Sequence, residues 1–514
     1  MPAEFGELTA KLAEIHDLGR AAALLSWDER TMMPRAGAEA RAEPLATLAR
    51  VRHEMFASDE VGRLIESLRP EAERLDPDSD LASLVRVVSR DWEKARRVPS
   101  ELRAEMARAA SLGESAWREA RRRSDFALLR PHLERNLELK LRFAAWYEGF
   151  ERFDHVYDPL LDEYEPRMAT AEMRALLDEL ARGLRPLIAA VVERQDAVDD
   201  SFLYGSFPVD AQRELVRELI GELPFGPESW RIDPTAHPFA SAISPRDVRL
   251  TTRYDPGYLP SALFGALHEA GHGLYEAGID PALARSPLGR PRSLGLHESQ
   301  SRLWENWVGR SRPYLRRIYP RLRATFPEEL EGVEAEGLYR AANRIRPSLT
   351  RIESDEITYN LHILLRFELE LELIEGRLAV ADLPEAWREL TRRDLGIEVP
   401  DDAHGVLQDV HWAAGSIGYF PTYSLGNVLA GQLWEAARRE LPELEELIGR
   451  GDFGPLGEWL RRTVHVHGRK LETREIVRRA TGDEIDVGPY LRHVGAKARE
   501  LYSLPDGALP SQAT

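Results

Sequence analysis

Apolar residues recur at intervals of three and four along most of this chain, and this spacing constrains the fold more than any other feature. The pattern is clearest in residues 8–27, 171–195 and 211–223. Ala, Leu, Glu and Arg, which favour helix, are abundant in these segments. We therefore predict a mainly α-helical protein whose charge-rich helix faces lie in solvent.

One short region departs from the helical pattern. Within residues 235–254, polar and apolar side chains alternate over positions 247–253, which is typical of a strand. Ser244 and Pro245 form a plausible turn just before it. We predict a small β-hairpin or short sheet inside an otherwise helical protein.

The chain offers no clear point at which to divide it. It has no low-complexity segment, clear repeat or long linker, so residues 1–514 are predicted to form a single domain. Within it we expect an N-terminal helical part up to about residue 200 and a second part over about 201–504. Residues 505–514 are predicted to be a frayed tail.

Composition excludes several classes of function. A net charge of -18 argues against nucleic acid or a membrane surface as a partner. The absence of cysteine excludes disulfides, thiol nucleophiles and Cys-ligated zinc. There is no signal-peptide pattern, and no stretch approaches the roughly 20 apolar residues that span a bilayer. We expect a soluble, cytoplasmic protein.

A metal-binding pattern lies near the middle of the chain. The sequence HEAGH places His268 and His272 one turn apart on a helix predicted from about Pro260 to Gly278. Both imidazoles can then reach one zinc ion, and Glu269 can act as a general base on water without being a ligand. The alternative is a helix with two hydrogen-bonded, partly buried histidines.

A third ligand favours the metal interpretation. Glu298 lies 26 residues beyond His272, in a second helix predicted to begin around Leu296. Two histidines and one carboxylate leave a fourth position open for water, as in catalytic zinc sites. Glu305, in the same helix, is interpreted as a surface carboxylate. His297 is expected to support the ligands without binding the metal.

Six short motifs occur in a fixed order, and with them the chain resembles the carboxypeptidase Taq family of metallocarboxypeptidases. The motifs are HPF at 237–239, DxRxT at 247–251, HExxH at 268–272, HESQ at 297–300, TRIESD at 350–355 and GVLQDVHW at 405–412. Flanking stretches such as GYFPTYSLGN, from residue 418, extend the resemblance over essentially the whole chain. Thr350 and Ser354 depart from the usual family residues, but the charged residues beside them are present.

This resemblance implies a large helical, cleft-bearing fold related to neurolysin and angiotensin-converting enzyme. The small β-sheet would lie near the active site, and the N-terminal helices would cover the cleft. The resemblance also implies a homodimer with one Zn²⁺ per chain, which Co²⁺ could replace. The implied activity is release of single C-terminal residues from peptide substrates with broad specificity.

Further roles follow from the resemblance. Arg351 is expected to bind the C-terminal carboxylate of the substrate, because a planar guanidinium suits a carboxylate. His411, which Gln408 and Asp409 could orient, and a tyrosine are expected to stabilise the oxyanion. Sequence does not separate Tyr423 from Tyr419; we favour Tyr423 and expect Tyr419 to contact substrate. Either could instead be a core tyrosine.

The β region has an expected role as well. Asp247, Arg249 and Thr251 resemble the family segment that closes the cleft and limits substrate length, and His237 would belong to the same wall. Each could equally be a structural hydrogen-bonding residue.

Among the other histidines, His465 and His467 could face one way on a strand, but no carboxylate partner is evident and we predict no second metal site. His362 is expected to be a packed or surface residue. Two other functions stay open: an oligoendopeptidase or dipeptidyl carboxypeptidase on the same scaffold, and a non-catalytic, zinc-containing peptide-binding protein.

Overall fold

Helices dominate the structure, as the sequence predicts, and one small sheet accompanies them. The computed structural model describes residues 2–505, so all but the first residue of the predicted tail lies outside the described residues. The three periodic segments form helices α1 (Ala3–Thr31), α8 (Thr170–Val192) and α9 (Val209–Gly221). None of the helices within residues 2–505 has the length and apolar composition needed for a membrane crossing.

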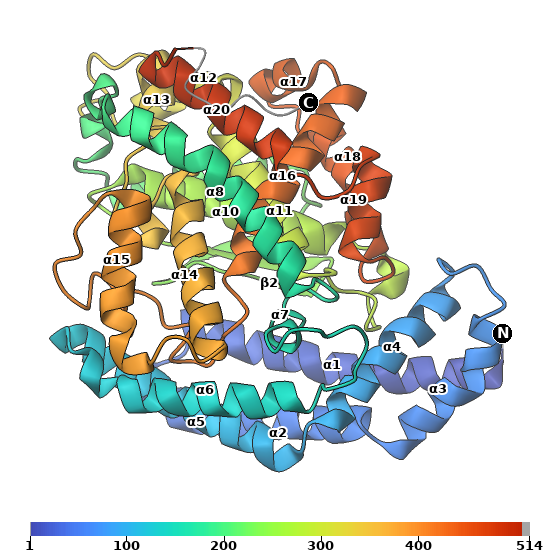
Figure 1. The fold of residues 1–514 in the computed structure, drawn as a ribbon. Helices are drawn as coiled ribbons and strands as arrows, with labels where there is room; N and C mark the ends of the chain where they lie inside the picture. The colour runs from blue at the N-terminus through green and yellow to red at the C-terminus, as the bar shows by residue number, and fades with distance from the viewer. Residues whose placement is uncertain (1, 506–514) are drawn as a thin grey trace.

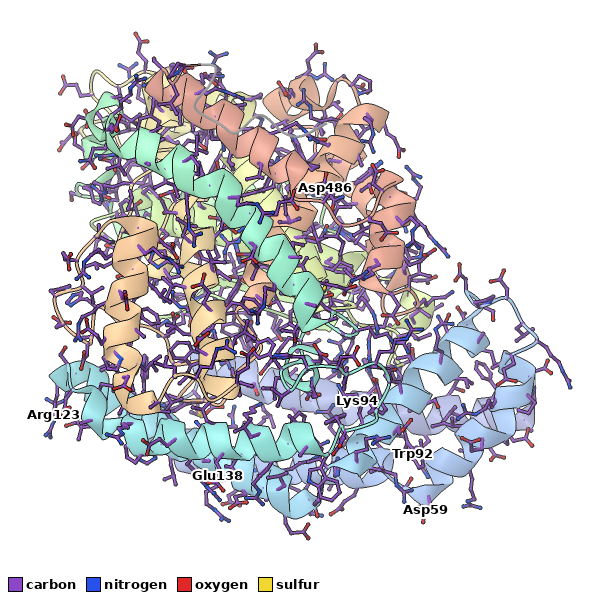
Figure 2. The ribbon with its side chains drawn as sticks, in the orientation of Figure 1. Asp59, Trp92, Lys94, Arg123, Glu138 and Asp486 are labelled. Atoms are coloured by element: carbon purple, nitrogen blue, oxygen red, sulfur yellow. The ribbon has the colours of Figure 1, made fainter. Side chains whose placement is uncertain are left out.

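The first six helices lie together along one side of the molecule (Figure 1). After α1 they are α2 (Ala38–Phe56), α3 (Asp59–Ala72), α4 (Asp80–Arg97), α5 (Ser100–Arg123) and α6 (Arg130–Ala145). Figure 2 shows Asp59, Arg123 and Glu138, which are exposed, extending outward from these helices. The charge-rich faces therefore lie in solvent, as predicted.

The sheet has three strands, β1 (Trp230–Pro234), β2 (Ala240–Ser244) and β3 (Asp247–Thr252). Strand β3 is central, antiparallel to β2 and parallel to β1. The β2–β3 pair and its turn confirm the predicted hairpin. Strand β1 was missed, because its alternating run, Trp230 to Asp233, is only four residues long and ends at a proline. The buried side chains of Val248 and Leu250 contact Gly273 of the neighbouring helix.

That helix, α10 (Leu259–Gly278), carries HEAGH and packs against α11 (Leu294–Arg302), which carries HESQ. On its other side α11 lies along α16 (Pro421–Glu440). Two glycines make these approaches possible. A Cβ at Gly271 would lie 2.4 Å from the carbonyl oxygen of Gln300, and one at Gly426 would lie 2.5 Å from Cγ of Glu298. Both contacts therefore help to fix Glu298 between its neighbours.

The chain between α11 and α12 continues as a π-helical segment, Leu303–Gly309. The other helices, most of them in the second half of the chain, complete the body of the protein around α10, α11 and α16. They are α7 (Asp158–Leu161), α12 (Arg312–Thr325), α13 (Ala335–Ala342), α14 (Thr358–Ile374), α15 (Leu383–Leu395), α17 (Leu444–Arg450), α18 (Gly454–Thr463), α19 (Thr473–Thr481) and α20 (Gly488–Tyr502).

A buried carboxylate on α14 anchors the segment that leads into α16. Glu370 accepts hydrogen bonds from Trp412 Nε1 at 2.7 Å, from the amide of Gly418 at 3.0 Å and from the hydroxyl of Tyr157. Burial raises the pKa of Glu370 to about 7, although these three donors oppose the change. The folded protein therefore holds a proton on this group at a pH where the unfolded chain has released it.

From this difference we predict that the free energy of unfolding falls as pH rises from about 4.5 to about 7. The contribution of Glu370 approaches roughly 3 kcal/mol over that window, because the proton binds more tightly in the folded state. Urea denaturation of the metal-free protein at several pH values measures the free energy of unfolding and its slope with pH. Glu370→Gln should flatten this part of the profile, whatever it does to absolute stability, whereas Glu372→Gln, on the same helix, should keep the slope. Equal slopes for all three proteins would contradict the prediction.

Candidate metal and active site

His268, His272 and Glu298 come together where α10 meets α11. Each offers one ligand atom, and the three atoms lie within 4.8 Å of one another. Glu298 Oε2 is 3.6 Å from Nε2 of His268 and 3.4 Å from Nε2 of His272. Tetrahedral zinc with bonds of about 2.1 Å separates its ligands by roughly 3.4 Å, so these atoms could share one ion.

The other nitrogen of each imidazole has a partner. His268 Nδ1 lies 2.9 Å from Oε2 of Glu305, and His272 Nδ1 lies 3.1 Å from the carbonyl oxygen of His297. Both acceptors favour a proton on Nδ1, which leaves the Nε2 lone pairs directed at the common point. The ring of His297 also stacks on His272, with centroids 4.2 Å apart. The residues present therefore fit a divalent metal.

Charge near Glu298 keeps it ionised. Burial alone would raise the pKa of Glu298, but Arg302 and His268 hold it well below its usual range. Arg302 Nε donates to Glu298 Oε1 at 2.8 Å, and Ser301 Oγ donates to Oε2 at 3.1 Å. Arg302 also stacks over the ring of Tyr359, 4.3 Å from its centroid. This leaves a carboxylate that is anionic and held in one orientation.

Glu305 is not the surface carboxylate that we predicted. Its side chain is only 13% exposed, and besides His268 it contacts Arg302 at 3.3 Å and Arg310 at 3.2 Å. Burial opposes ionisation, but His268 and Arg302 lower the pKa of Glu305 to about 2. The prediction was wrong because Glu305 lies, with Glu298 and Arg302, on the helix face that packs against α10, beneath the first histidine.

Glu269, next to His268 on α10, is 6% exposed. Burial raises the pKa of Glu269 above its ordinary value, although His268 and His272 act in the opposite direction. A carboxylate with raised proton affinity beside a metal site is suited to general-base chemistry.

His411, Tyr419 and Tyr423 form an aromatic cluster next to Glu298. Tyr419 has ring centroids 5.2 Å from both His411 and Tyr423. Burial raises the pKa of Tyr423 well above its usual value and lowers that of His411 to about 4. At neutral pH the cluster therefore presents an uncharged imidazole and protonated hydroxyl groups, all able to donate hydrogen bonds. Its place beside Glu298 follows from Gly426, one turn beyond Tyr423 on α16.

Arg351 lies against this cluster, with Cζ 5.0 Å from the ring centroid of Tyr423. It is buried and donates to Asp409 Oδ1 at 2.7 Å and to the hydroxyl of Tyr359 at 2.8 Å. Asp409 also pairs with Arg366, at 2.6 Å, and its Oδ1 lies 3.6 Å from Nδ1 of His411. The main partners of Asp409 are thus the two arginines.

Gln408, by contrast, bonds to backbone oxygens and to both arginines, and no hydrogen bond to His411 is found among the described residues.

The β-region residues are held by contacts of their own. Thr251 is fully buried, and its hydroxyl bonds both the amide and the carbonyl of Phe239 at 2.7 Å. Arg249 pairs with Asp247 at 2.9 Å and stacks over Trp27 of α1, 4.4 Å from the ring centroid. These contacts explain the residues structurally, and a role in substrate binding stays a prediction.

His237 is exposed and lines a separate cavity of about 610 Å³ together with Arg213, Arg253 and Tyr254.

His465 and His467 do not lie on a strand: they form a 3₁₀ turn, in which buried His465 bonds Gln300 at 2.8 Å. His362 is packed inside α14, as expected.

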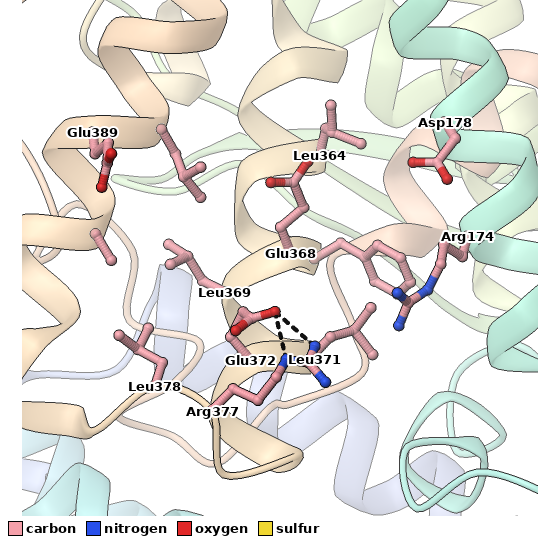
Figure 3. Close-up of a pocket in the computed structure, with 13 residues that line it drawn as sticks. Arg174, Asp178, Leu364, Glu368, Leu369, Leu371, Glu372, Arg377, Leu378 and Glu389 are labelled. Carbon is pink, nitrogen blue, oxygen red and sulfur yellow. Dashed lines mark hydrogen bonds and ion pairs between the residues drawn. The ribbon is translucent and has the colours of Figure 1, made fainter.

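Another cavity, of about 450 Å³, lies between α8, α14 and α15 (Figure 3). Two of its charged residues, Glu372 and Arg377, pair with one another at 2.6 Å. It holds none of the predicted site residues, so it is not a candidate for the catalytic centre.

Sequence reasoning missed two residues that connect the metal cluster to Arg351. Arg302 pairs with Glu298 and stacks on Tyr359, whose hydroxyl accepts from Arg351. Arg302 follows Glu298 by four residues and precedes Glu305 by three, which puts all three on one helix face. This spacing could have revealed Arg302. Nothing in the sequence marks Tyr359.

We predict that Glu305→Gln weakens Zn²⁺ binding by about tenfold or more, because a neutral amide fixes the His268 tautomer less strongly. Competition with a chromogenic chelator measures the affinity, and circular dichroism checks the fold. Glu331→Gln, at an exposed carboxylate, serves as the control and should bind as the parent protein does. Unchanged affinity in a folded Glu305→Gln protein would show that Glu305 does not support the ligand.

Proteins named as carboxypeptidases are similar to this chain along nearly their whole length. A Thermus thermophilus protein named thermostable carboxypeptidase 1 is 43% identical over 505 residues, covering 97% of this chain and 98% of the relative. Carboxypeptidase 1 of Bacillus subtilis is 37% identical over 493 residues, covering 96% and 97%. The crystal structure of an M32 carboxypeptidase from Deinococcus radiodurans R1 matches with a TM-score of 0.94 at 40% identity, covering 98% of this chain and 100% of that one.

The family model described as carboxypeptidase Taq (M32) metallopeptidase matches residues 7–498. The mainly helical fold with its small sheet is thus the fold of solved M32 carboxypeptidases. The protein is a metallocarboxypeptidase that belongs to the carboxypeptidase Taq (M32) family.

Proposed function

We propose that this metallocarboxypeptidase releases single amino acids from the free C-termini of peptides, with broad specificity, using Zn²⁺ held by His268, His272 and Glu298. One observation carries the proposal: two imidazole nitrogens and one carboxylate oxygen converge on a common point beside Glu269. A divalent ion there would supply Lewis acidity, which polarises a carbonyl and makes water a stronger nucleophile at neutral pH. Imidazole ligands suit zinc, and Co²⁺ could replace it.

Glu269 moves the proton in this proposal. It takes a proton from the attacking water and then delivers one to the leaving amine. Its position one residue after His268, buried and with raised proton affinity, supports both steps.

Hydrogen-bond donors stabilise the negative charge that develops on the carbonyl oxygen. His411 and Tyr423 fill this role in the proposal, because both are uncharged donors in a water-poor site where such bonds are strong. Tyr419 contacts the substrate beside them.

Arg351 binds the substrate carboxylate. Its bonds to Asp409 and Tyr359 leave one N–H on each terminal nitrogen of the guanidinium for a ligand. These bonds also hold the planar group in place, so little side-chain entropy is lost when substrate binds.

His237, Asp247, Arg249 and Thr251 are proposed to limit the length of peptide beyond the scissile bond. The homodimer, the cytoplasmic location and the division near residue 200 into a covering part and a catalytic part stay predictions.

Cleavage of a peptide and of its C-terminally amidated twin, followed by mass spectrometry, tests the proposed cut. We expect successive single-residue losses from the free peptide only, since the amide offers no carboxylate to Arg351. A chelator should abolish them, and Glu269→Gln should reduce the rate at least a hundredfold while the protein keeps its metal. Internal cuts would indicate an oligoendopeptidase instead, and losses of two residues at a time would indicate a dipeptidyl carboxypeptidase. Normal hydrolysis by metal-loaded Glu269→Gln would contradict the role of Glu269.

The two tyrosines can be separated by conservative substitution. We predict that Tyr423→Phe lowers kcat about a hundredfold with little change in KM, since a donor to the oxyanion acts in the transition state. Tyr419→Phe should act mainly on KM. Steady-state kinetics on one peptide measures both variants. The opposite ranking would assign the oxyanion role to Tyr419, and normal kcat in both would remove tyrosine from it.

A further inference from the structure

A cavity of about 330 Å³ lies where α1, α2 and α4 meet the loops that follow α10 and α18. Its apolar lining includes Leu12, Ile15 and Phe56. Its charged lining is mostly basic, with Arg52 from α2 and Arg290 and Arg469 from the two loops. We call this space the arginine cavity. Its volume is at the lower end of the range for small-ligand sites.

The positive charge of this cavity is not neutralised by the protein. Asp91 is the one carboxylate that lines it, and Arg469 already holds that group by two bonds, at 2.7 and 3.0 Å. Among the described residues, neither Arg52 nor Arg290 has a carboxylate oxygen within 4.0 Å. This is unexpected in a chain with a net charge of -18, where acidic partners are plentiful.

Arg52 is held in the cavity despite an unmet hydrogen-bond donor. Its Nε is buried and has no partner among the described residues. Gly19 of α1 makes the room, because a Cβ there would lie only 3.0 Å from Cζ of Arg52. A buried donor without an acceptor destabilises the folded protein, and a ligand acceptor that enters the cavity would remove this destabilisation.

The arginines also destabilise one another's charge. Arg290 is exposed on one side of the cavity. Partial loss of hydration, and then the charges of Arg20, Arg52 and Arg469, lower the pKa of Arg290 to about 10, whereas Glu276 acts in the opposite direction. Arg20 itself donates to Nε2 of His16, at 2.9 Å, instead of to a carboxylate. The fold thus keeps several like charges close together, with Asp91 already paired to Arg469 and no carboxylate oxygen within 4.0 Å of Arg52 or Arg290 among the described residues, and a bound anion would stabilise this arrangement.

We propose that the arginine cavity binds an oxyanion, with Arg52 and Arg290 as its principal ligands. Guanidinium groups present paired N–H donors that match the oxygens of a carboxylate or a phosphate, and such charge-assisted bonds are the stronger kind. The anion comes either from solution, as phosphate, or from an acidic side chain of a bound peptide. The chemistry of recognition is the same for both.

The cavity lies near the candidate active site. Arg20 and Arg290 act electrostatically on Glu276, which lies one turn beyond His272 on α10. Glu276 Oε1 is in turn 3.8 Å from Nε2 of His297, the residue stacked on His272. Glu276 and His297 therefore connect the arginine cavity to the metal ligand His272.

Titration of the full-length protein with inorganic phosphate, by calorimetry and by thermal melting at constant ionic strength, tests the proposal. We expect saturable binding and a rise in Tm with phosphate that chloride does not reproduce. Arg52→Gln and Arg290→Gln should each weaken phosphate binding at least tenfold. Because each removes a mutually repelling charge, Tm without phosphate should stay equal or rise, so loss of binding can be distinguished from misfolding.

Arg50→Gln is the matched control, since Arg50 lies on α2 but is exposed and pairs with Glu54 at 3.0 Å. It should bind phosphate within twofold of the parent protein. Absence of a phosphate-specific response, or equal affinity in Arg52→Gln, Arg290→Gln and the parent, would overturn the proposal.

Peptide kinetics then identifies the source of the anion. If a peptide carboxylate occupies the cavity, phosphate will compete with peptides that contain Glu but not with their Gln counterparts, and Arg290→Gln will abolish the preference. If phosphate binds while both peptides respond equally, the site takes a free oxyanion. Either result keeps the cavity as an oxyanion site.

Discussion

The site depends on how closely α11 approaches the helices on its two sides. Gly271 lets α10 reach the backbone of α11, and Gly426 lets α16 contact the side chain of Glu298. One carboxylate is thereby placed opposite two imidazoles on one side and beside Tyr419 and Tyr423 on the other. A methyl group at either glycine would have to displace rigid backbone or the carboxylate stem, and close-packed interiors yield little to such a change.

Around this contact the charges form a connected network. Glu305 supports His268, Arg302 joins Glu305 to Glu298, and Tyr359 connects Arg302 with Arg351. Nearly every member of the network is buried, so each ion has a partner that offsets its lost hydration. The guanidinium proposed to bind substrate is consequently fixed relative to the ligands of the metal. Geometry of this kind is what a reaction between bound groups requires.

The arginine cavity contrasts with that network. There the arginines outnumber the one carboxylate, Asp91, and the buried Nε of Arg52 has no partner among the described residues. Gly19 leaves the space that Arg52 occupies. In the network, each buried charge is paired with an opposite charge of the protein. In the cavity, Arg52 and Arg290 have no such partner, and for this reason we propose that the cavity binds an anion although the whole chain is acidic.

The sequence by itself determined the helical class, the hairpin, and the three residues that converge, because spacing along a helix sets which side chains share a face. Ordered motifs added the family and its activity. Strand β1, the inward turn of Glu305 and the place of Tyr359 were decided only by tertiary structure. Strand β1 is short and ends at a proline, and the face that carries Glu305 is buried only because α10 packs against it. Tyr359 lies far from Arg302 in sequence, and only packing brings the two side chains together.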